Sequence, residues 1–421
     1  MHLADDLHLT YCTNIHPGEA WEEVRSSLAT YGPELKQRLC PERPFGIGLR
    51  LSNLAAVELQ EGNRLAAFRD ALERDGLYVF TLNGFPYGSF HREKVKEMVH
   101  APDWRTRERG DYTIRLAQIL AGLLPADVSE GSISTSPLSY KPWLDGTAAA
   151  AAPDWAACVA QLVRVTQALL AIEEETGKYI HVDLEPEPDG LLETAGEVCA
   201  FFRDHLLAGG AEQVAAAVGL SQEAARAVLL RYVGVCLDTC HMAIAYETPH
   251  DFVGQLASMG IRIGKVQISS ALKIPLAGAG QPAGLAVEDL PAALAPYMES
   301  TYLHQVIQRN ADGSLTRYRD LPDALAGLPA EGVAAREWRV HFHVPVFTAN
   351  CGAFGSTQQD ILDTLAVLAQ NRFTNHLEIE TYTWDVLPSH LKQDLADSIV
   401  REFTWTRQVL PARYAGRDVS Q

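Results

Sequence analysis

The sequence contains few cysteines, and their spacing indicates neither a disulfide framework nor a metal cluster. The seven cysteines lie at positions 12, 40, 158, 199, 236, 240 and 351, with no CxxC pair and no zinc-finger spacing. An odd number of dispersed cysteines is typical of free thiols in a reducing compartment. We therefore expect neither a structural zinc site nor an iron-sulfur cluster.

The sequence also lacks a long apolar run and a recognisable leader. No apolar run approaches the roughly 20 residues that span a bilayer. The first residues, MHLADDLHLTYCTN, show no basic region followed by an apolar stretch. These absences predict a cytoplasmic protein.

Positive charge is scarce. The chain has 35 Lys and Arg against 53 Asp and Glu, a formal net charge of −18. Nonspecific binding to nucleic acid depends on many Lys and Arg contacts with phosphates. We therefore expect no nucleic-acid partner; a small-molecule metabolite as ligand is implied instead by family resemblances of the motifs.

The sequence contains enough hydrophobic residues for a large core, and strand-like and helix-like segments alternate along it. Of its 421 residues 47% are hydrophobic and 21% charged, as in globular proteins. Short β-rich runs alternate with longer amphipathic segments, an order that indicates βα units around a parallel sheet. This pattern predicts an α/β fold, a single (β/α)8 barrel domain over 1–421. Nine candidate strands compete for the eight barrel positions: 7–14, 46–52, 77–85, 131–140, 179–186, 233–240, 264–271, 338–347 and 376–384.

Residues 271–336 interrupt this alternation. They begin with a Pro/Gly/Ala-rich stretch and continue into YLHQVIQRNADGSLTRYRDL, where Asp312-Gly313 separates two strand-like halves. An Asp-Gly pair in this setting indicates a β-hairpin, so we expect a hairpin-containing insertion in a late βα loop. The segment 338–347 then either joins the hairpin as a third strand or takes a barrel position, in which case 264–271 is the accessory strand.

Polar residues collect where the predicted strands end. The active site of a (β/α)8 barrel lies at the carboxyl ends of its strands. Carboxylate, imidazole and amide groups that converge from separate strands suit Mn²⁺, Zn²⁺, Mg²⁺ or Co²⁺. A helix-capping Asp238 and a buried core His241 are the simpler interpretation of that pair, but matching ligands on other strands favour a site. The candidates are Glu185, Glu187, Asp238, His241, Gln267, Ser269, His341, His343, Glu378 and Glu380, with Asn14 and Asn83 as further strand-end or loop residues.

The segment GVCLDTCH resembles the Asp-Thr-Cys-His segment of endonuclease IV, within the xylose isomerase-like barrel superfamily. That resemblance implies a divalent metal ion held by Glu185, Asp238 and Glu380, which match the family positions on strands five, six and eight. The fourth ligand stays open, because KVQISS offers Gln267 where many relatives have His, and His343 is the alternative.

A wider set of motifs resembles the metabolite-traffic proteins called EboE. These motifs are LTYCTNIHPGE, TLNGFPYGSFH, HVDLEPEP, LDTCH, YLHQVIQR, HFHVPVF and LEIETYTWDVLP. The resemblance implies a xylose isomerase-like barrel encoded with other small-metabolite proteins, including a prenyltransferase-like membrane protein that is a possible partner.

Two function classes follow from these resemblances. The first is an isomerase or epimerase, in which Glu185 and Glu380 move a proton and His241 orients the substrate. The second is a binding or carrier module that docks to a membrane partner through the insertion. A phosphodiesterase like endonuclease IV is disfavoured, because the additional ligands for two or three metal ions are not found in order.

Overall fold

Eight parallel strands form a nearly closed barrel in the computed structural model, which describes residues 1–88, 95–144, 154–276, 285–298, 300–328, 335–384, 386–388 and 392–414. The strand order is β1-β14-β7-β6-β5-β4-β3-β2, and a bridge between Cys12 and Gly48 joins the two end strands. The predicted (β/α)8 barrel is thereby confirmed. Its strands are β1 (His8–Tyr11), β2 (Phe45–Arg50), β3 (Leu77–Asn83), β4 (Glu130–Thr135), β5 (Tyr179–Leu184), β6 (Val233–Asp238), β7 (Ile263–Ile268) and β14 (His376–Ile379).

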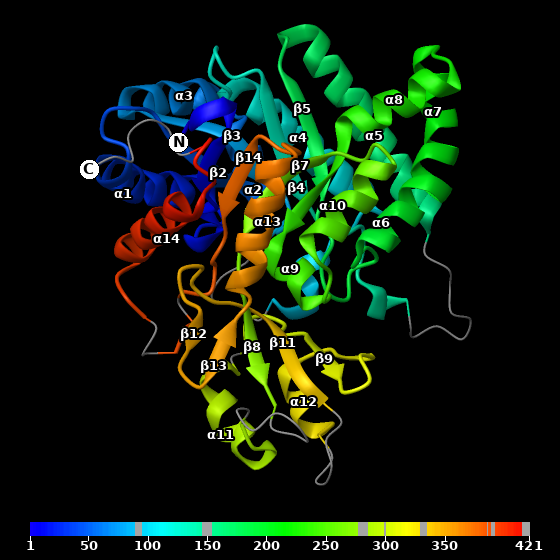
Figure 1. The fold of residues 1–421 in the computed structure, drawn as a ribbon. Helices are drawn as coiled ribbons and strands as arrows, with labels where there is room; N and C mark the ends of the chain where they lie inside the picture. Colours follow the sequence, from blue (N-terminus) through cyan, green and yellow to red (C-terminus); the bar gives the residue numbers. More distant parts are fainter. Residues whose placement is uncertain are drawn as a thin grey trace.

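Helices surround the barrel and bury their apolar faces against it (Figure 1). The longest, α5, begins after Asp154, whose side chain accepts a hydrogen bond from Ala157 N at 3.0 Å, and ends at Gly177 in the left-handed region. The helices around the barrel are α1 (Trp21–Leu39), α2 (Asn53–Leu59), α3 (Arg64–Asp75), α4 (Arg107–Leu123), α5 (Trp155–Thr176), α6 (Ala195–Phe201), α7 (Ala211–Val218), α8 (Gln222–Tyr232), α9 (Thr239–Ile244), α10 (Pro249–Ser258), α13 (Gln358–Gln370) and α14 (Leu395–Val409).

Helix α5 is also long and apolar enough to cross a membrane, by length and composition only. No such segment was expected from the sequence. In the structure α5 packs against α4, β5 and α8, and seven of its residues, from Cys158 to Leu169, are buried. It therefore occupies the place of an outer helix of the barrel.

A second, antiparallel sheet lies below the barrel in Figure 1, on the side toward which β14 runs. The predicted hairpin is present: β9 and β10 pair around Gly313, and β11 pairs with β9. Segment 338–347 thus joins the hairpin, while 264–271 supplies barrel strand β7. That residues 1–421 form one domain stays a prediction. The second sheet continues past residue 336, the predicted end of the insertion. Its strands are β8 (Ala271–Pro275), β9 (Val306–Asn310), β10 (Leu315–Tyr318), β11 (Ala335–His343), β12 (Asn350–Cys351) and β13 (Phe354–Ser356), with helices α11 (Leu290–Leu294) and α12 (Leu321–Ala326) nearby.

The barrel interior is polar beneath the strand ends. Lys265 and Glu378 form an ion pair there with no exposed surface, and Lys265 Nζ also donates to Ser134 Oγ at 3.2 Å. Gly48 leaves the room for this pair, because a Cβ on Gly48 would overlap the Glu378 carboxylate. The side chain of Lys265 is thus neutralised inside the barrel.

Candidate metal and proton-transfer site

The two carboxylate oxygens of Asp238 differ in their contacts: Oδ1 caps a helix, and Oδ2 is left without a partner among the described residues. It is the last residue of β6 and the cap of α9, so Oδ1 accepts hydrogen bonds from the backbone N of Cys240 (2.7 Å) and His241 (3.0 Å). Ser269 Oγ donates to the same oxygen at 2.6 Å. Oδ2 has no hydrogen-bond partner among the described residues, although it is buried. The capping interpretation is therefore correct but incomplete.

Three buried carboxylates meet at the strand ends. Glu185 follows β5, Asp238 ends β6 and Glu380 follows β14, and one oxygen from each lies within 4.8 Å of the others. Burial, followed by the charges of neighbouring carboxylates, raises the pKa of both Glu185 and Glu380 well above the ordinary value. Burial acts in the same direction on Asp238, but His241, His343 and its hydrogen bonds outweigh it, and the pKa of Asp238 is lowered. Such a cluster is costly unless a cation or protons compensate it.

Two histidines complete the cluster. One ligand atom each from Asp238, His241 and His343 lie within 4.8 Å of one another. His343 Nδ1 lies 2.9 Å from the carbonyl oxygen of Glu380, which can only accept, so this nitrogen carries the proton and Nε2 keeps its lone pair. Burial lowers the pKa of both rings, that of His241 to about 4, which favours the neutral form that binds metals.

Whether this cluster fits a divalent metal ion can be judged from its buried polar atoms that have no hydrogen-bond partner. Across the described part of the chain, four atoms of the cluster are buried without a hydrogen-bond partner, and all are metal-ligand atom types: Glu185 Oε2, Asp238 Oδ2, His241 Nδ1 and His343 Nε2. Buried polar atoms are nearly always satisfied, so the convergence of four such atoms suits the binding of a cation. Mixed carboxylate and imidazole donors suit Mn²⁺, Co²⁺ or Zn²⁺, and carboxylates suit Mg²⁺. The side chains of this cluster therefore fit a divalent metal ion.

Between the two candidates for the fourth ligand, the geometry favours His343. Gln267 is fully buried on β7, but its Oε1 accepts a hydrogen bond from Cys236 Sγ at 3.2 Å, and only its donor nitrogen lacks a partner. A metal ion would need the oxygen. Gln267 as a metal ligand stays a prediction. The ligand and catalytic roles predicted for the other site residues also stay predictions.

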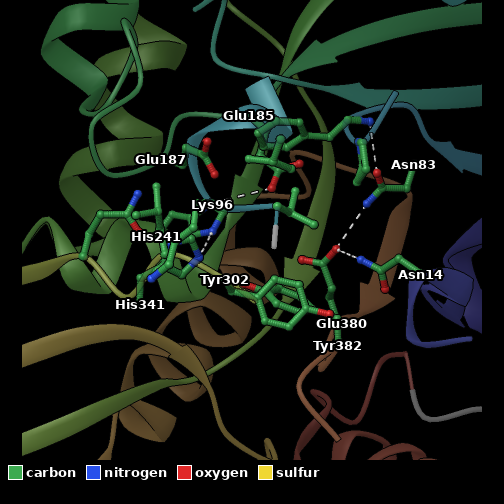
Figure 2. A pocket seen from close by; sticks show the side chains of 16 residues that line it. Asn14, Asn83, Lys96, Glu185, Glu187, His241, Tyr302, His341, Glu380 and Tyr382 are labelled. Carbon is green, nitrogen blue, oxygen red and sulfur yellow. Dashed lines mark hydrogen bonds and ion pairs between the residues drawn. The ribbon is translucent and has the colours of Figure 1, made fainter. Parts of the chain in front are cut away.

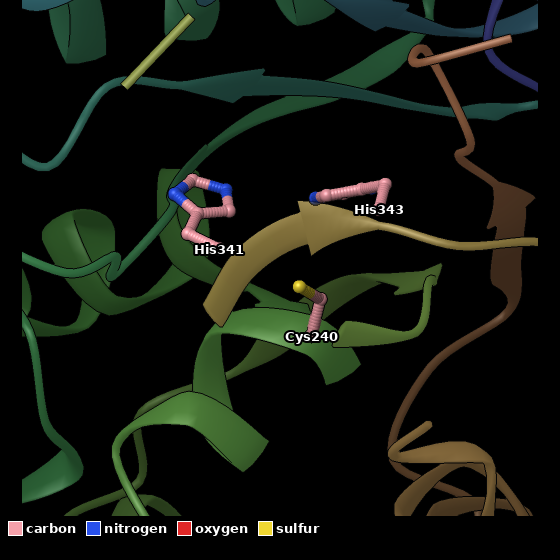
Figure 3. Close-up of side chains that lie close together, drawn as sticks. All are labelled: Cys240, His341 and His343. Atoms are coloured by element: carbon pink, nitrogen blue, oxygen red, sulfur yellow. The ribbon is translucent and has the colours of Figure 1, made fainter. Parts of the chain in front are cut away.

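Cys240, His341 and His343 form a further cluster (Figure 3). His341 and His343 stand on β11, and Cys240 belongs to α9. Burial raises the pKa of Cys240 well above the ordinary value, so the thiol keeps its proton. Both ring nitrogens of His341 are already engaged, by Gln305 and by His241. This cluster is therefore less suited to a metal than the carboxylate cluster.

Two asparagines hold Glu380 in place. Asn14 Nδ2 and Asn83 Nδ2 donate to Glu380 Oε1 at 2.8 and 3.1 Å (Figure 2). Asn14 follows β1 and Asn83 ends β3, so the strand-end interpretation of both residues agrees with the geometry. The neighbouring candidate Glu378 lies apart, since its side chain points into the barrel toward Lys265.

A pocket opens above these groups, with an empty volume of about 600 Å³ including its mouth. Glu185, Glu187, His241 and Glu380 lie on its inner side, and its walls are largely apolar (Figure 2). Lys96, Tyr302 and Gln305 also line the pocket, although they were not among the residues predicted from the sequence. Tyr302 and Gln305 reach the pocket because β11 pairs with β9, a long-range contact that no local sequence signal reports. The apolar wall residues include Phe85, Pro86, Val95, Val99, Leu303 and Tyr382.

Comparison with known proteins supports the fold and not a family. No protein-family model matches the chain, and no curated protein matches it. A xylose isomerase-like TIM barrel protein from Mycobacterium smegmatis, solved in complex with magnesium, aligns over 99% of this chain and 100% of its own, with a TM-score of 0.50 and 12% identity. The chain has the xylose isomerase-like barrel fold.

Two other solved structures are similar at lower scores. They are the IOLI protein with a bound zinc atom (TM-score 0.44, 12% identity, 97% of this chain and 99% of that one) and D-psicose 3-epimerase with D-tagatose from Clostridium cellulolyticum H10 (0.43, 14%, 96% and 100%). The resemblance to the EboE proteins has no match among these comparisons and stays a prediction.

Proposed function

We propose that this protein is a metal-dependent enzyme of the isomerase or epimerase type, acting on a small metabolite with a carbonyl next to a hydroxyl-bearing carbon. The observation that carries the proposal is the convergence of four orphaned ligand atoms with two carboxyls of raised pKa at one point beneath a pocket. A general acid or base works best when its pKa lies near the working pH, and burial shifts carboxyls in that direction.

In this proposal Glu185, Asp238, His343 and Glu380 hold the divalent ion, with Gln267 as the alternative fourth ligand. When bound, the ion polarises the carbonyl and the neighbouring hydroxyl of the substrate. Glu185 follows β5 and Glu380 follows β14, so the two carboxyls approach the ion from different strands, and both line the pocket in which a substrate would bind.

The proton transfer is assigned to these two glutamates. One carboxylate takes the proton from the hydroxyl-bearing carbon beside the carbonyl, the C–H electron pair forms the new carbon-carbon double bond, and the second glutamic acid protonates the carbonyl oxygen, which gives an enediol. In isomerisation the hydroxyl of the first carbon returns a proton to the second glutamate and becomes the new carbonyl, while the first glutamic acid delivers its proton to the former carbonyl carbon. In epimerisation the protonated oxygen returns its proton to the second glutamate, which then delivers it to the opposite face of the first carbon. Asn14 and Asn83 hold Glu380 in position for this step. His241 Nδ1 lies beside the same point and would serve there as a further ligand of the ion or, as the sequence predicts, orient a substrate oxygen.

A second candidate is binding without turnover. The apolar pocket walls suit a precursor that has an apolar part beside its polar head. On the resemblance to the EboE proteins, such a precursor would be handed to a prenyltransferase-like membrane protein in a metabolite-export pathway, with the second sheet as the docking surface.

Solvent deuterium exchange separates the two candidates. The protein is reconstituted with Mn²⁺, Co²⁺ or Zn²⁺ and incubated in D₂O with a panel of hydroxycarbonyl compounds that are then analysed by mass spectrometry. We expect deuterium in at least one compound, loss of exchange in Glu185→Gln and Glu380→Gln, and no change in Glu212→Gln, an exposed residue on α7. Compounds that bind without any exchange would contradict turnover and favour the carrier.

A further inference from the structure

A hydrogen-bonded chain runs from the second sheet into the barrel site. Gln305 Nε2 donates to the carbonyl oxygen of Pro188 at 3.2 Å, and Gln305 Oε1 lies 2.9 Å from His341 Nδ1. His341 Nε2 lies 3.0 Å from His241 Nε2. Gln305 and His341 are 3% and 8% exposed, so water does not substitute freely for these contacts. The chain joins the loop after β5, the second sheet and α9.

The donor and acceptor of every hydrogen bond in this chain follow from the carbonyl of Pro188, at which the chain begins. The carbonyl of Pro188 can only accept, so the amide nitrogen of Gln305 faces it and Oε1 faces His341. His341 Nδ1 therefore carries the proton. A neutral imidazole has one N–H, which leaves a lone pair on His341 Nε2 that accepts from His241 Nε2–H. Since Nε2 of the neutral His241 ring carries its one N–H, the lone pair of His241 is on Nδ1.

That lone pair faces the carboxylate cluster. His241 Nδ1 lies 3.6 Å from Glu185 Oε1 and 4.0 Å from Asp238 Oδ1, and among the described residues it makes no hydrogen bond of good geometry, although the backbone of Pro186 also interacts with the ring. In the other tautomer Nδ1 would carry a proton toward Glu185 and would present no lone pair to a cation. A ligand histidine usually donates its second N–H to a carboxylate, a carbonyl or water. His343 follows that rule through Glu380 O, whereas His241 depends on a second imidazole.

We propose that Gln305 and His341 are positioning residues that lock His241 in the tautomer whose Nδ1 can bind a divalent ion. The second sheet would thereby tune a site that lies in the barrel. The inference rests on the proposed function only for what His241 binds; the tautomer itself is a property of the metal-free protein.

The test is the tautomer of His241 in metal-free protein labelled with ¹⁵N-histidine, read from long-range ¹H–¹⁵N spectra and assigned with His241→Asn. In the wild type we expect Nε2 protonated and Nδ1 bare. Gln305→Leu and His341→Phe should each shift His241 toward the Nδ1–H form or a mixture. Gln305→Glu keeps the acceptor and should retain the wild-type tautomer.

The matched control is Gln308→Leu. Gln308 lies on β9 in the same sheet and accepts from Trp338 Nε1 at 2.8 Å, but among the described residues no hydrogen bond connects it to the hydrogen-bonded chain that reaches His241. Gln305→Leu should weaken Co²⁺ binding about 10-fold, the lower end of typical effects of such partners, whereas Gln308→Leu should leave it unchanged. A protonated Nδ1 in the wild type, or an unchanged tautomer in Gln305→Leu, overturns the inference. The expected tautomers with no Co²⁺ binding would instead overturn the proposed metal site.

Discussion

Asn14 and Glu380 are 366 residues apart in the chain, yet Asn14 Nδ2 donates to Glu380 Oε1 at 2.8 Å. The contact exists because β1 and β14 are neighbours in the barrel, so the ends of the first and last barrel strands meet. Asn83, from β3, donates to the same oxygen. One oxygen of Glu380 is thus fixed by two amides, and the orientation of the other follows.

Removing these amides should impair proton transfer without removing the site. Hydrogen bonds to a charged group contribute about 1.5–3 kcal/mol, so we expect Asn14→Ala and Asn83→Ala each to slow deuterium exchange by roughly 10-fold or more. The bound metal, measured by mass spectrometry, should stay near the wild-type amount. Asn371→Ala, at the end of α13, serves as control; equal losses in the control would contradict a specific role.

Metal content should depend on the cluster residues. We expect about one divalent ion per chain in protein purified without a metal-affinity tag, and its loss in Glu185→Gln and Asp238→Asn with the fold intact by circular dichroism. Removing the ion with a chelator should lower the melting temperature, because a ligand at 100 times its dissociation constant stabilises by about 2.7 kcal/mol.

The same assay decides the fourth ligand. His343→Phe should lose the ion, and Gln267→Leu should keep it, because the Gln267 oxygen is engaged by Cys236. The reverse result would make Gln267 the ligand. Retention of the ion in every variant would mean that the metal is bound elsewhere.

Stability should fall as pH rises, in part because of Glu402. This residue lies on α14, 2% exposed, and burial raises the pKa of its carboxyl to about 7, against the opposing hydrogen bonds from Thr381 and Val346. The protonated carboxyl favours the folded state, so its contribution is full below the ordinary pKa of about 4.5 and is lost as pH rises through about 7.

The shift corresponds to a loss on the order of 3 kcal/mol. Urea unfolding of metal-free Glu402→Gln between pH 5 and pH 8 should show a correspondingly smaller decrease than the wild type. Glu212→Gln, on the surface of α7, should follow the wild-type curve. Parallel curves for wild type and Glu402→Gln would show that Glu402 does not titrate in this range.

Two glycine-to-alanine substitutions should have opposite effects on stability. A Cβ on Gly48 would overlap the Glu378 carboxylate and the backbone oxygen of Tyr11, so Gly48→Ala should lower the free energy of unfolding by about 1–3 kcal/mol. Gly254, within α10, has open space around a Cβ. Gly254→Ala should raise stability by about 0.5–1 kcal/mol. Chemical denaturation measures both, and a tolerated Gly48→Ala would show that the interior carboxylate can move.

The sequence predicts the barrel because its signals are local: each strand is a short apolar run with its polar residues at the carboxyl end. The same rule places Glu185, Asp238 and Glu380 at the barrel end where they are found. What escapes prediction depends on pairing between distant segments. His341 and His343 could be named, but their approach to α9 requires β11 to join β9. Gln305 precedes a strand and carries no local signal, and the ion pair of Lys265 with Glu378 depends on the pairing of β7 with β14, which are far apart in the sequence.

The ion pair of Lys265 with Glu378 has a consequence for the charge of the whole site. Since Lys265 neutralises Glu378, that carboxylate adds no charge to the site, and the buried carboxyls that remain at the strand ends are Glu185, Glu187, Asp238 and Glu380. A divalent cation offsets two negative charges of these four groups. A buried region that tends toward electroneutrality then favours protons retained on the others. Burial raises the pKa of Glu185, Glu187 and Glu380, whereas the pKa of Asp238 is lowered, so the retained protons belong to the glutamates, the residue type to which the proton transfer is assigned.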